Sequence, residues 1–378
     1  MMIRAYLDNN ATTRPYDAVL KAQLLVQQEL YLNASSLAGE LLGAARPLAE
    51  ARMAMLNLLG GDAEDRLVLT SGASEANAWA VFGATSSGSH IVTTAVEHRS
   101  ILAASEAARA RGLTVALVGV DANGLISPDT LAASLRPDTQ LVSIQLANNE
   151  TGVIQPLGSL AAMIRKNAPG ALIHCDATQA VARITIDLSD MLAEIDLLSF
   201  SAHKFHGPKG IGGLFIRDGV ELTPLIAGEQ EGGLRGGTSN APGAAGLAVA
   251  ARQAQANLKA MAAVAELRDE LESRLLALYP GAQINGAGAP RLPNTSSVLF
   301  PGALAEDLVE ALALQGICVA TGSACTAGAT APSHVLTAMG LAPADARATL
   351  RFSLSVETQH QEIDLTLAAL APLLKFAG

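Results

Sequence analysis

Short runs of β-branched and leucine residues recur between residues 66 and 217 and predict seven buried strands. The predicted strands cover residues 66–70, 90–94, 114–118, 141–145, 171–176, 196–200 and 213–217. Helical patterns lie between most of them, for example at 74–82, 101–111 and 157–166. Strands that alternate with helices indicate an α/β fold with a largely parallel sheet, in which ligands bind beyond the carboxyl ends of the strands.

The pattern changes after residue 243 to a long alanine-rich helical stretch that ends near Tyr279-Pro280-Gly281. Four elements are predicted beyond it: a strand at 296–300, a helix at 303–314, a strand at 317–321 and a C-terminal helix from about Gln359. Residues 1–15 are too short to fold alone. We therefore predict a large domain at 16–255 and a smaller α/β domain made of 1–15 and 256–378.

Composition agrees with this division. A chain of 378 residues is long for one hydrophobic core. Half of its residues are hydrophobic but only 3% are aromatic, so Ala, Leu, Val and Ile must fill the core. Such a core suits helices that cover both faces of a buried sheet.

Charge and hydropathy exclude several classes of protein. The net charge of −10, with scattered Lys and Arg, argues against direct binding of nucleic acid or of an anionic membrane. Mean hydropathy is +0.31, yet no apolar run reaches the roughly 18 residues of a spanning helix. The first eight residues lack the apolar core of a signal peptide. We expect a soluble cytoplasmic protein.

The three cysteines, Cys175, Cys318 and Cys325, have neither the even count of a disulfide framework nor the CxxC spacing of a zinc site. Each is therefore a buried small residue or a reactive thiol. His203 and His206 have a spacing that could suit a metal, but we expect a phosphate contact and a structural role instead.

Four polar clusters follow predicted strands, where the fold would place a site. They are Thr70-Ser71-Gly72-Ala73-Ser74-Glu75, Val96-Glu97-His98, His174-Cys175-Asp176-Ala177-Thr178-Gln179 and the run from Ser201 to Gly210. The N–H groups and hydroxyls of the first cluster suit a phosphate at a helix start. Its simpler interpretation is an N-cap by Ser71 or Ser74.

The other clusters also have two interpretations each. Asp176 ends an apolar strand, where a carboxylate needs a partner such as a protonated ring nitrogen, or else caps a helix. His98 could stack on a ring or be a satisfied core or surface histidine. Lys204 could form a Schiff base if desolvation and nearby cations deprotonate it, or be a solvated lysine in a Gly-rich turn.

Taken together, a phosphate cup, a ring-stacking His, an Asp for a pyridinium nitrogen and an aldehyde-capturing Lys are the parts that pyridoxal 5′-phosphate (PLP) requires. Dinucleotide binding is poorly supported, because the glycine runs at 210–213 and 232–237 do not open a βαβ unit with GxGxxG.

The order and spacing of these motifs resemble the cysteine desulfurases, within the class V aminotransferase family of fold-type I PLP enzymes. The resemblance covers nearly the whole chain. It includes Tyr6-Leu7-Asp8-Asn9-Asn10-Ala11-Thr12-Thr13, Ala147-Asn148-Asn149-Glu150-Thr151-Gly152, Arg291-Leu292-Pro293-Asn294-Thr295, Gly322-Ser323-Ala324-Cys325-Thr326 and Pro332-Ser333-His334-Val335-Leu336. It implies a mostly parallel seven-stranded sheet flanked by helices, with a smaller C-terminal α/β domain.

The resemblance also implies roles for individual residues. Lys204 holds PLP as a Schiff base, His98 stacks on the ring and Asp176 pairs with the ring nitrogen. Further contacts to the cofactor come from Asn149 and Gln179 near the ring substituents and from Ala73, Ser74, Ser201 and His203 around the phosphate. Thr238 reaches the phosphate of a neighbouring subunit, which implies a homodimer. Arg351, with Asn149 beside it, binds the substrate carboxylate from the smaller domain, which also carries the Cys325 loop.

The implied reaction starts from L-cysteine. Lys204 removes the α-proton as general base, and the Cys325 thiolate attacks the substrate sulfur. The products are alanine and a persulfide on Cys325, which passes to an acceptor such as an iron–sulfur scaffold, a tRNA-modifying enzyme or a DNA-modification system.

Several segments depart from the family pattern. They are Asn33-Ala34-Ser35-Ser36-Leu37-Ala38, Ala227-Gly228-Glu229-Gln230-Glu231, Arg235-Gly236-Gly237-Thr238 and Ser355. They leave three alternatives open: a selenocysteine lyase, another class V aminotransferase or β-lyase that does not use Cys325, and a non-catalytic subunit of a sulfur-transfer assembly.

Overall fold

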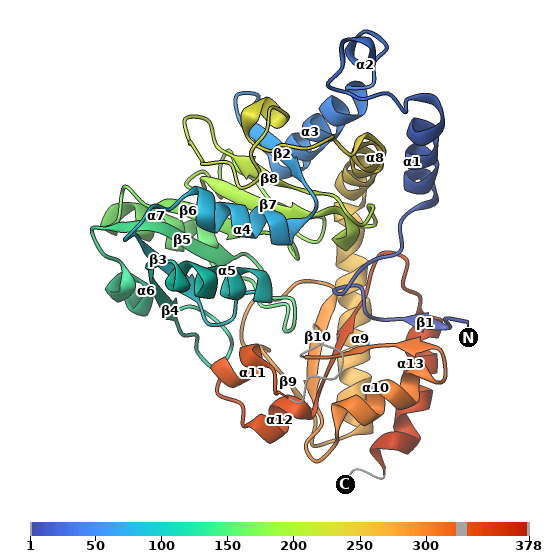
Figure 1. Cartoon of the computed structure of the whole chain (residues 1–378). Coiled ribbons are helices and arrows are strands. Elements are labelled where there is room, and N and C mark those ends of the chain that lie inside the picture. The colour runs from blue at the N-terminus through green and yellow to red at the C-terminus, as the bar shows by residue number, and fades with distance from the viewer. Residues whose placement is uncertain (1, 323–330, 376–378) are drawn as a thin grey trace.

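A computed structural model describes residues 2–322 and 331–375 of the chain (Figure 1). All seven strands predicted between residues 66 and 217 are present, and they form one sheet in the order β2-β8-β7-β6-β5-β3-β4. Their bounds are β2 (Arg66–Thr70), β3 (His90–Thr94), β4 (Thr114–Val118), β5 (Thr139–Gln145), β6 (Leu172–Asp176), β7 (Leu197–Ser201) and β8 (Gly212–Ile216).

The sheet is mostly parallel, which confirms the predicted fold class. The five strands from β7 to β4 pair in parallel, whereas β8 is antiparallel to both of its neighbours, β7 and β2. Every residue of β3, β7 and β8 is buried, as expected for apolar strands covered on both faces.

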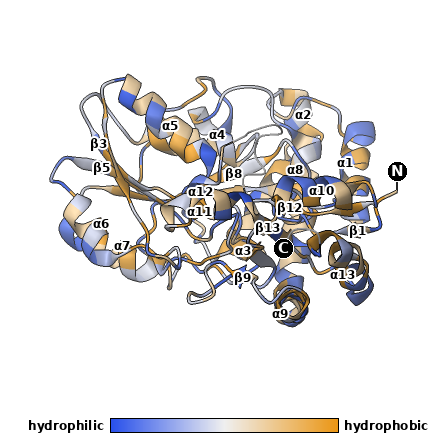
Figure 2. Cartoon of the chain, turned by 90° about the horizontal axis from the view of Figure 1, so that it is seen from below, coloured by the Kyte–Doolittle hydropathy of each residue, from blue (hydrophilic) through white to orange (hydrophobic). Residues whose placement is uncertain are grey.

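Helices cover both faces of this sheet. In Figure 2, α4 (Ala73–Gly83) and α5 (Arg99–Ala110) lie on one side of β3 and β5, and α6 (Pro128–Ser134) and α7 (Leu157–Asn167) lie on the other. The α6 and α7 face is extended by α1 (Asp17–Glu29), α3 (Arg46–Leu59) and α8 (Ala241–Asn257), with the short α2 (Leu37–Leu41) above them. Alanines such as Ala51, Ala244 and Ala248 allow α3 and α8 to pack closely in the core.

A second hydrophobic core lies apart from the first and contains Leu271, Phe300, Phe352 and Leu370. It is built from α9 (Met261–Leu278), α10 (Ala305–Ala313), α13 (His360–Leu374) and a four-stranded antiparallel sheet, β12-β13-β10-β9. The strands of that sheet are β9 (Gln283–Ile284), β10 (Thr295–Leu299), β12 (Ala320–Thr321) and β13 (Thr349–Ser353). The predicted domain boundary near residue 255 stays a prediction, and these two separate cores support it.

The N-terminal segment joins the second core. β1 (Ala5–Tyr6) pairs in parallel with β11 (Ile317–Cys318), and the segment then continues toward the large sheet. Residues 317–321, expected to be one strand, are divided into β11 and β12, which belong to different sheets. Two short helices, α11 (His334–Ala338) and α12 (Pro343–Arg347), complete this part of the fold. No helix in the described ranges is both long and apolar enough to cross a membrane.

Candidate active site

The four polar clusters meet around one cavity of about 510 Å³ at the carboxyl ends of the strands. The predicted cofactor residues that line it are Ala73, Ser74, His98, Asn149, Asp176, Gln179, Ser201, His203 and Lys204. They come from the ends of β2, β3, β5, β6 and β7 and the segments that follow them. The fold thus brings together residues that lie more than a hundred positions apart in the sequence.

The start of α4 forms one wall of the cavity. Its N-cap is Gly72, and no side chain caps the helix, so the alternative that Ser71 or Ser74 serves as N-cap is wrong. The N–H groups of the first turn therefore remain for an anion. β8 passes very close to this turn, because a Cβ atom on Gly212 would lie 2.7 Å from the Cα atom of Gly72.

The surroundings of His203 are positively charged. Burial, together with the nearby cations Lys204, Lys209 and Arg183, lowers the pKa of His203 to about 4. Lys209 also lines the cavity, although the sequence analysis gave it no role. A neutral His203 hydrogen-bonds through Nδ1 to the Thr12 hydroxyl at 3.0 Å. This concentration of positive charge beside the start of α4 suits a phosphate.

Asp176 and His98 are both held at the cavity wall by short-range hydrogen bonds, and in the described part of the chain no helix directly follows Asp176 for it to cap. Asp176 accepts a hydrogen bond from the backbone N–H of Thr178 at 3.0 Å and one from Asn77 at 2.7 Å, and it lines the cavity. His98 is the N-cap of α5, where it accepts from the N–H of Ser100, and it also lines the cavity. Burial lowers the pKa of His98. These hydrogen bonds therefore fix both side chains at the cavity wall.

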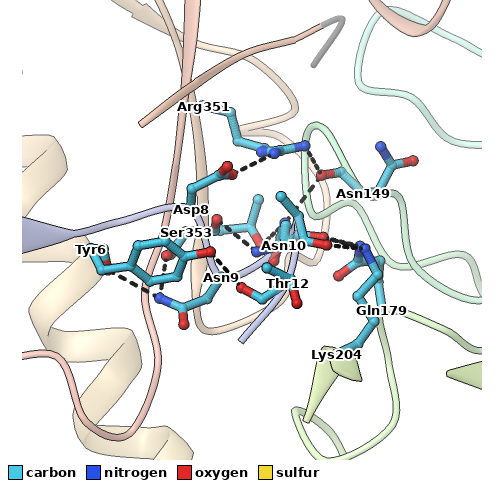
Figure 3. A network of polar contacts seen from close by, with 12 residues as sticks. Tyr6, Asp8, Asn9, Asn10, Thr12, Asn149, Gln179, Lys204, Arg351 and Ser353 are labelled. Carbon is cyan, nitrogen blue, oxygen red and sulfur yellow. Dashed lines mark hydrogen bonds and ion pairs between the residues drawn. The ribbon is translucent and has the colours of Figure 1, made fainter. Parts of the chain in front are cut away.

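Lys204 lies in a short 3-10 turn, Ala202–Lys204, directly after β7. Its ammonium donates to the carbonyl oxygens of Asn10 at 2.6 Å and Ala11 at 2.8 Å (Figure 3). Gln179 donates to the same Asn10 carbonyl at 3.0 Å. The N-terminal segment therefore borders the cavity beside the lysine.

Arg351 approaches from β13 of the second core. Its guanidinium donates to the Asp8 carboxylate at 2.7 Å and to the Asn149 carbonyl at 3.1 Å (Figure 3). The side chain is only 3% exposed, and its Nε has no hydrogen-bond partner among the residues that the structure describes. A second, more open cavity is shared by Arg351, Asn149 and Lys204. Arg351 can therefore offer donors to a molecule held near the lysine.

Thr238 does not line the main cavity but lies beside it. It is exposed and lines a neighbouring cavity with Ser71 and Gly210, residues that also line the main cavity. The adjacent Arg235 is held by Glu75 of α4 through an ion pair of 2.9 Å.

Cys325 falls outside the described residues. The segments on either side of it contact Glu150, the neighbour of Asn149: Ser333 donates to the Glu150 carboxylate, and a Cβ atom on Gly322 would lie 3.0 Å from it. Burial raises the pKa of Glu150 to about 7.

Cys175 is fully buried, and burial raises the pKa of its thiol, so it is a core residue. Cys318 is half-buried in β11.

Besides Lys209, three polar residues beside the site were not indicated by the sequence pattern. Asn77 lies three positions after Ser74, hence on the same face of α4, and this spacing is a signal that could have identified it. Arg183, one turn after Gln179, donates to the Gln179 side chain at 2.6 Å. Asn10 was quoted only as part of a motif, yet its side chain donates to the Asn149 carbonyl at 3.1 Å and to the Thr295 hydroxyl at 2.9 Å.

The chain is similar to known proteins along nearly its whole length. Residues 5–366 match the family model described as aminotransferase class-V. The chain is 45% identical over 377 residues to a cysteine desulfurase of Cereibacter sphaeroides, covering 98% of this chain and 96% of that protein. It is 39% identical over 374 residues to a cysteine desulfurase of Klebsiella pneumoniae, covering 99% and 93%.

Two solved structures share the fold. A NifS-like protein superposes with a TM-score of 0.91 at 36% identity, covering 99% of this chain and all (100%) of that chain. SspA, solved in complex with cysteine, superposes with a TM-score of 0.80 at 33% identity, covering 94% of this chain and 100% of that chain.

Proposed function

Because the chain belongs to the class V aminotransferase family and, within it, to the cysteine desulfurases, we propose that it transfers the sulfur of L-cysteine to its own Cys325. The products are L-alanine and a persulfide on Cys325. The substrate Cβ–S bond breaks and an S–S bond forms; of the two thiol hydrogens, one is balanced by the proton that Cβ gains and the other stays on the persulfide. The observation that carries the proposal is the cavity in which Lys204, Asp176 and His98 meet, bordered by Arg351.

The residues of this cavity fit PLP. An amine on Lys204, a buried carboxylate on Asp176 and an imidazole on His98 correspond to the aldehyde, ring nitrogen and ring face of that cofactor. The uncapped start of α4 at Ala73 and Ser74, with Ser201 and His203, would hold the phosphate. When bound, PLP supplies an electron sink that makes the Cα–H bond of an amino acid acidic.

The chain's own residues would orient the substrate and move its proton. Arg351 would bind the substrate carboxylate, to which its Nε and terminal nitrogens can donate. The Asn149 carbonyl is already bonded to that guanidinium, which keeps it turned toward the cavity. The Lys204 amine, which borders the same space, would take the proton from the substrate Cα.

Cys325 is the proposed sulfur acceptor. A thiolate is required for attack on the substrate sulfur, and an unperturbed thiol with a pKa of about 8.5 is mostly protonated at neutral pH. We therefore expect activation by the site or by the bound substrate. The persulfide then passes to an acceptor such as an iron–sulfur scaffold or a tRNA-modifying enzyme.

A homodimer is part of the proposal. Thr238 lies at the surface beside the phosphate cup, where a residue that serves a neighbouring subunit should be. Leu37 and Leu41 of α2 are 75% and 76% exposed, and such apolar surface is typical of a protein contact. The cytoplasmic location expected from the N-terminal sequence stays a prediction.

The test is incubation of the PLP-loaded protein with L-cysteine and a thiol reductant, with alanine, sulfide and pyruvate quantified. A cysteine desulfurase yields alanine and sulfide in equal amounts. Pyruvate in place of alanine would indicate a β-lyase, alanine from L-selenocysteine alone would indicate a selenocysteine lyase, and no turnover of either would indicate a non-catalytic subunit.

A further inference from the structure

Asn77, a residue of α4 behind the cavity, contacts both arms of the proposed ring-binding site. Its side chain is fully buried. One N–H of its amide donates to the Asp176 carboxylate at 2.7 Å, and the other donates to the Ser100 hydroxyl at 2.9 Å. Ser100 is in turn the hydrogen-bond partner of His98. A single amide group therefore links the carboxylate and the imidazole.

The arm toward His98 supplies one of the two donors that fix which ring nitrogen carries the proton. Because the Ser100 hydroxyl accepts from Asn77, its own hydrogen can point to Nδ1 of His98, 2.8 Å away. The backbone N–H of Ser100 approaches the same nitrogen at 3.2 Å. A nitrogen approached by two donors must accept, so the neutral ring carries its proton on Nε2.

The arm toward Asp176 continues behind Asn77 through buried polar side chains. The Ser199 hydroxyl donates to the amide oxygen of Asn77, so it can accept from Nε2 of His174 at 3.2 Å. Nδ1 of His174 lies 2.9 Å from the Ser143 hydroxyl. Burial lowers the pKa of His174 to about 4, so its ring is neutral and has a single proton to donate. With His174 protonated on Nε2, each donor from Ser143 to Asn77 points toward Asp176.

The hydrogen bonds of Asn77 favour one orientation of its side-chain amide. If the amide of Asn77 were reversed, its oxygen would face the Asp176 carboxylate and its N–H groups would face the hydrogen of Ser199. The two oxygens would repel each other, and the Ser199 hydroxyl would have to turn its hydrogen away, among buried side chains. The buried Asp176 carboxylate is thereby supplied with the donors that it needs, from Asn77 and from the N–H of Thr178.

We propose that Asn77 is a positioning residue that holds Asp176 as an acceptor for the cofactor ring and His98 as the Nε2–H tautomer. This inference rests on the proposed PLP site. His98 lines the cavity, so the protonated Nε2 is the atom through which it can donate to a ligand there. The apoprotein is already arranged in this way, because every hydrogen bond of this network is made between protein atoms.

The first readout is the tautomer of His98 in the apoprotein, measured by NMR after labelling the histidine rings with ¹⁵N. The His98 signals are identified by their loss in the His98→Gln variant. We expect an unprotonated Nδ1 and a protonated Nε2 in the native chain. The second readout is the dissociation constant of PLP, followed by its visible absorbance.

Two variants separate the arms. Asn77→Ala removes both, so we expect mixed His98 tautomers and a PLP dissociation constant raised about tenfold or more, as for loss of a hydrogen bond to a charged group. Ser100→Ala removes only the His98 arm, so we expect changed His98 signals and a smaller loss of PLP affinity than in Asn77→Ala. Ser105→Ala is the matched control, because Ser105 is also buried in α5 and its hydroxyl has no hydrogen-bond partner in the described part of the chain; it should change neither readout.

Native His98 protonated on Nδ1, or Asn77→Ala with native tautomer and native PLP affinity, would overturn the proposal. If Asn77→Ala does not fold, Ser100→Ala decides alone, and unchanged His98 signals contradict the proposal. If the native protein binds no PLP, the proposed function fails, whereas the apoprotein spectra still show whether the amide sets the tautomer.

Discussion

The guanidinium of Arg351 donates a hydrogen bond of 2.7 Å to the carboxylate of Asp8 and so connects β13 to the N-terminal segment beside Lys204 (Figure 3). The two residues are 343 positions apart in the chain. A carboxylate held by this guanidinium shows that its donors are oriented for carboxylate binding. In the proposed reaction the substrate carboxylate would share or replace that contact.

Arg351→Lys should raise the KM for L-cysteine by about tenfold or more, because lysine retains the charge but lacks the planar set of donors, and a charge-assisted hydrogen bond contributes about 1.5–3 kcal/mol. The absorbance of bound PLP should not change. Steady-state kinetics measure the KM, and the visible spectrum of the protein measures the bound PLP. Arg347→Lys, at an exposed arginine of α12, is the control, and an unchanged KM in Arg351→Lys would contradict the assignment.

Glu97 should make the stability of the apoprotein depend on pH. Burial raises its pKa from 4.5 to about 8. Between these values the unfolded chain has released a proton that the folded chain retains, so the native protein loses stability as the pH rises through this window.

Glu97→Gln has no proton to release, so its stability relative to the native chain should rise by up to about 1.4 kcal/mol per pH unit across the same window. Urea unfolding at several pH values from 5 to about 9 measures the difference. Glu106→Gln, at an exposed residue of the following helix, should run parallel to the native profile. If the pH profile of unfolding free energy for Glu97→Gln is also parallel to that of the native chain, Glu97 is ionised at neutral pH.

The large sheet could be predicted from the sequence because its strands are short, apolar and separated by helices. The antiparallel direction of β8 could not be predicted, since the sequence pattern of a strand buried on both faces is the same in either direction. The residues that line the cavity were indicated because most of them follow strands within compact motifs. Asn77 was not, because its importance lies in partners at positions 100, 176 and 199, which only the packing of α4 against the sheet brings together.

Thr238→Val should weaken PLP binding about tenfold, because it removes the hydroxyl that is proposed to donate to the phosphate of a neighbouring subunit. Thr238→Ser keeps the hydroxyl and should bind normally. A mixture of Thr238→Val and Lys204→Ala chains, refolded together, should regain tight PLP sites, since half-exchanged dimers contain one intact pair of residues. Absence of this gain would show that Thr238 does not serve a neighbouring subunit.

Gly236 lies in one of the segments that depart from the family pattern, and the surrounding backbone leaves no room for a side chain there. A Cβ atom at this position would lie 2.2 Å from the Ala227 carbonyl oxygen and 2.7 Å from the Cα atom of Gly228. Gly236→Ser should therefore destabilise the protein by about 1–3 kcal/mol, as overpacking does. Thermal unfolding measures this. Gly170→Ser, at a site with no heavy atom within 4 Å, should have little effect, and equal stability of both variants would refute the explanation.

The mass of the protein after a single turnover tests the central claim most directly. The PLP-loaded chain, mixed with L-cysteine without reductant, should gain the mass of one sulfur atom on the peptide that contains Cys325, with one alanine released per site. Cys318→Ser should behave in the same way, whereas Cys325→Ser should retain the PLP absorbance and form neither product. Sulfur found on another residue, or sulfide release that persists in Cys325→Ser, would contradict the account.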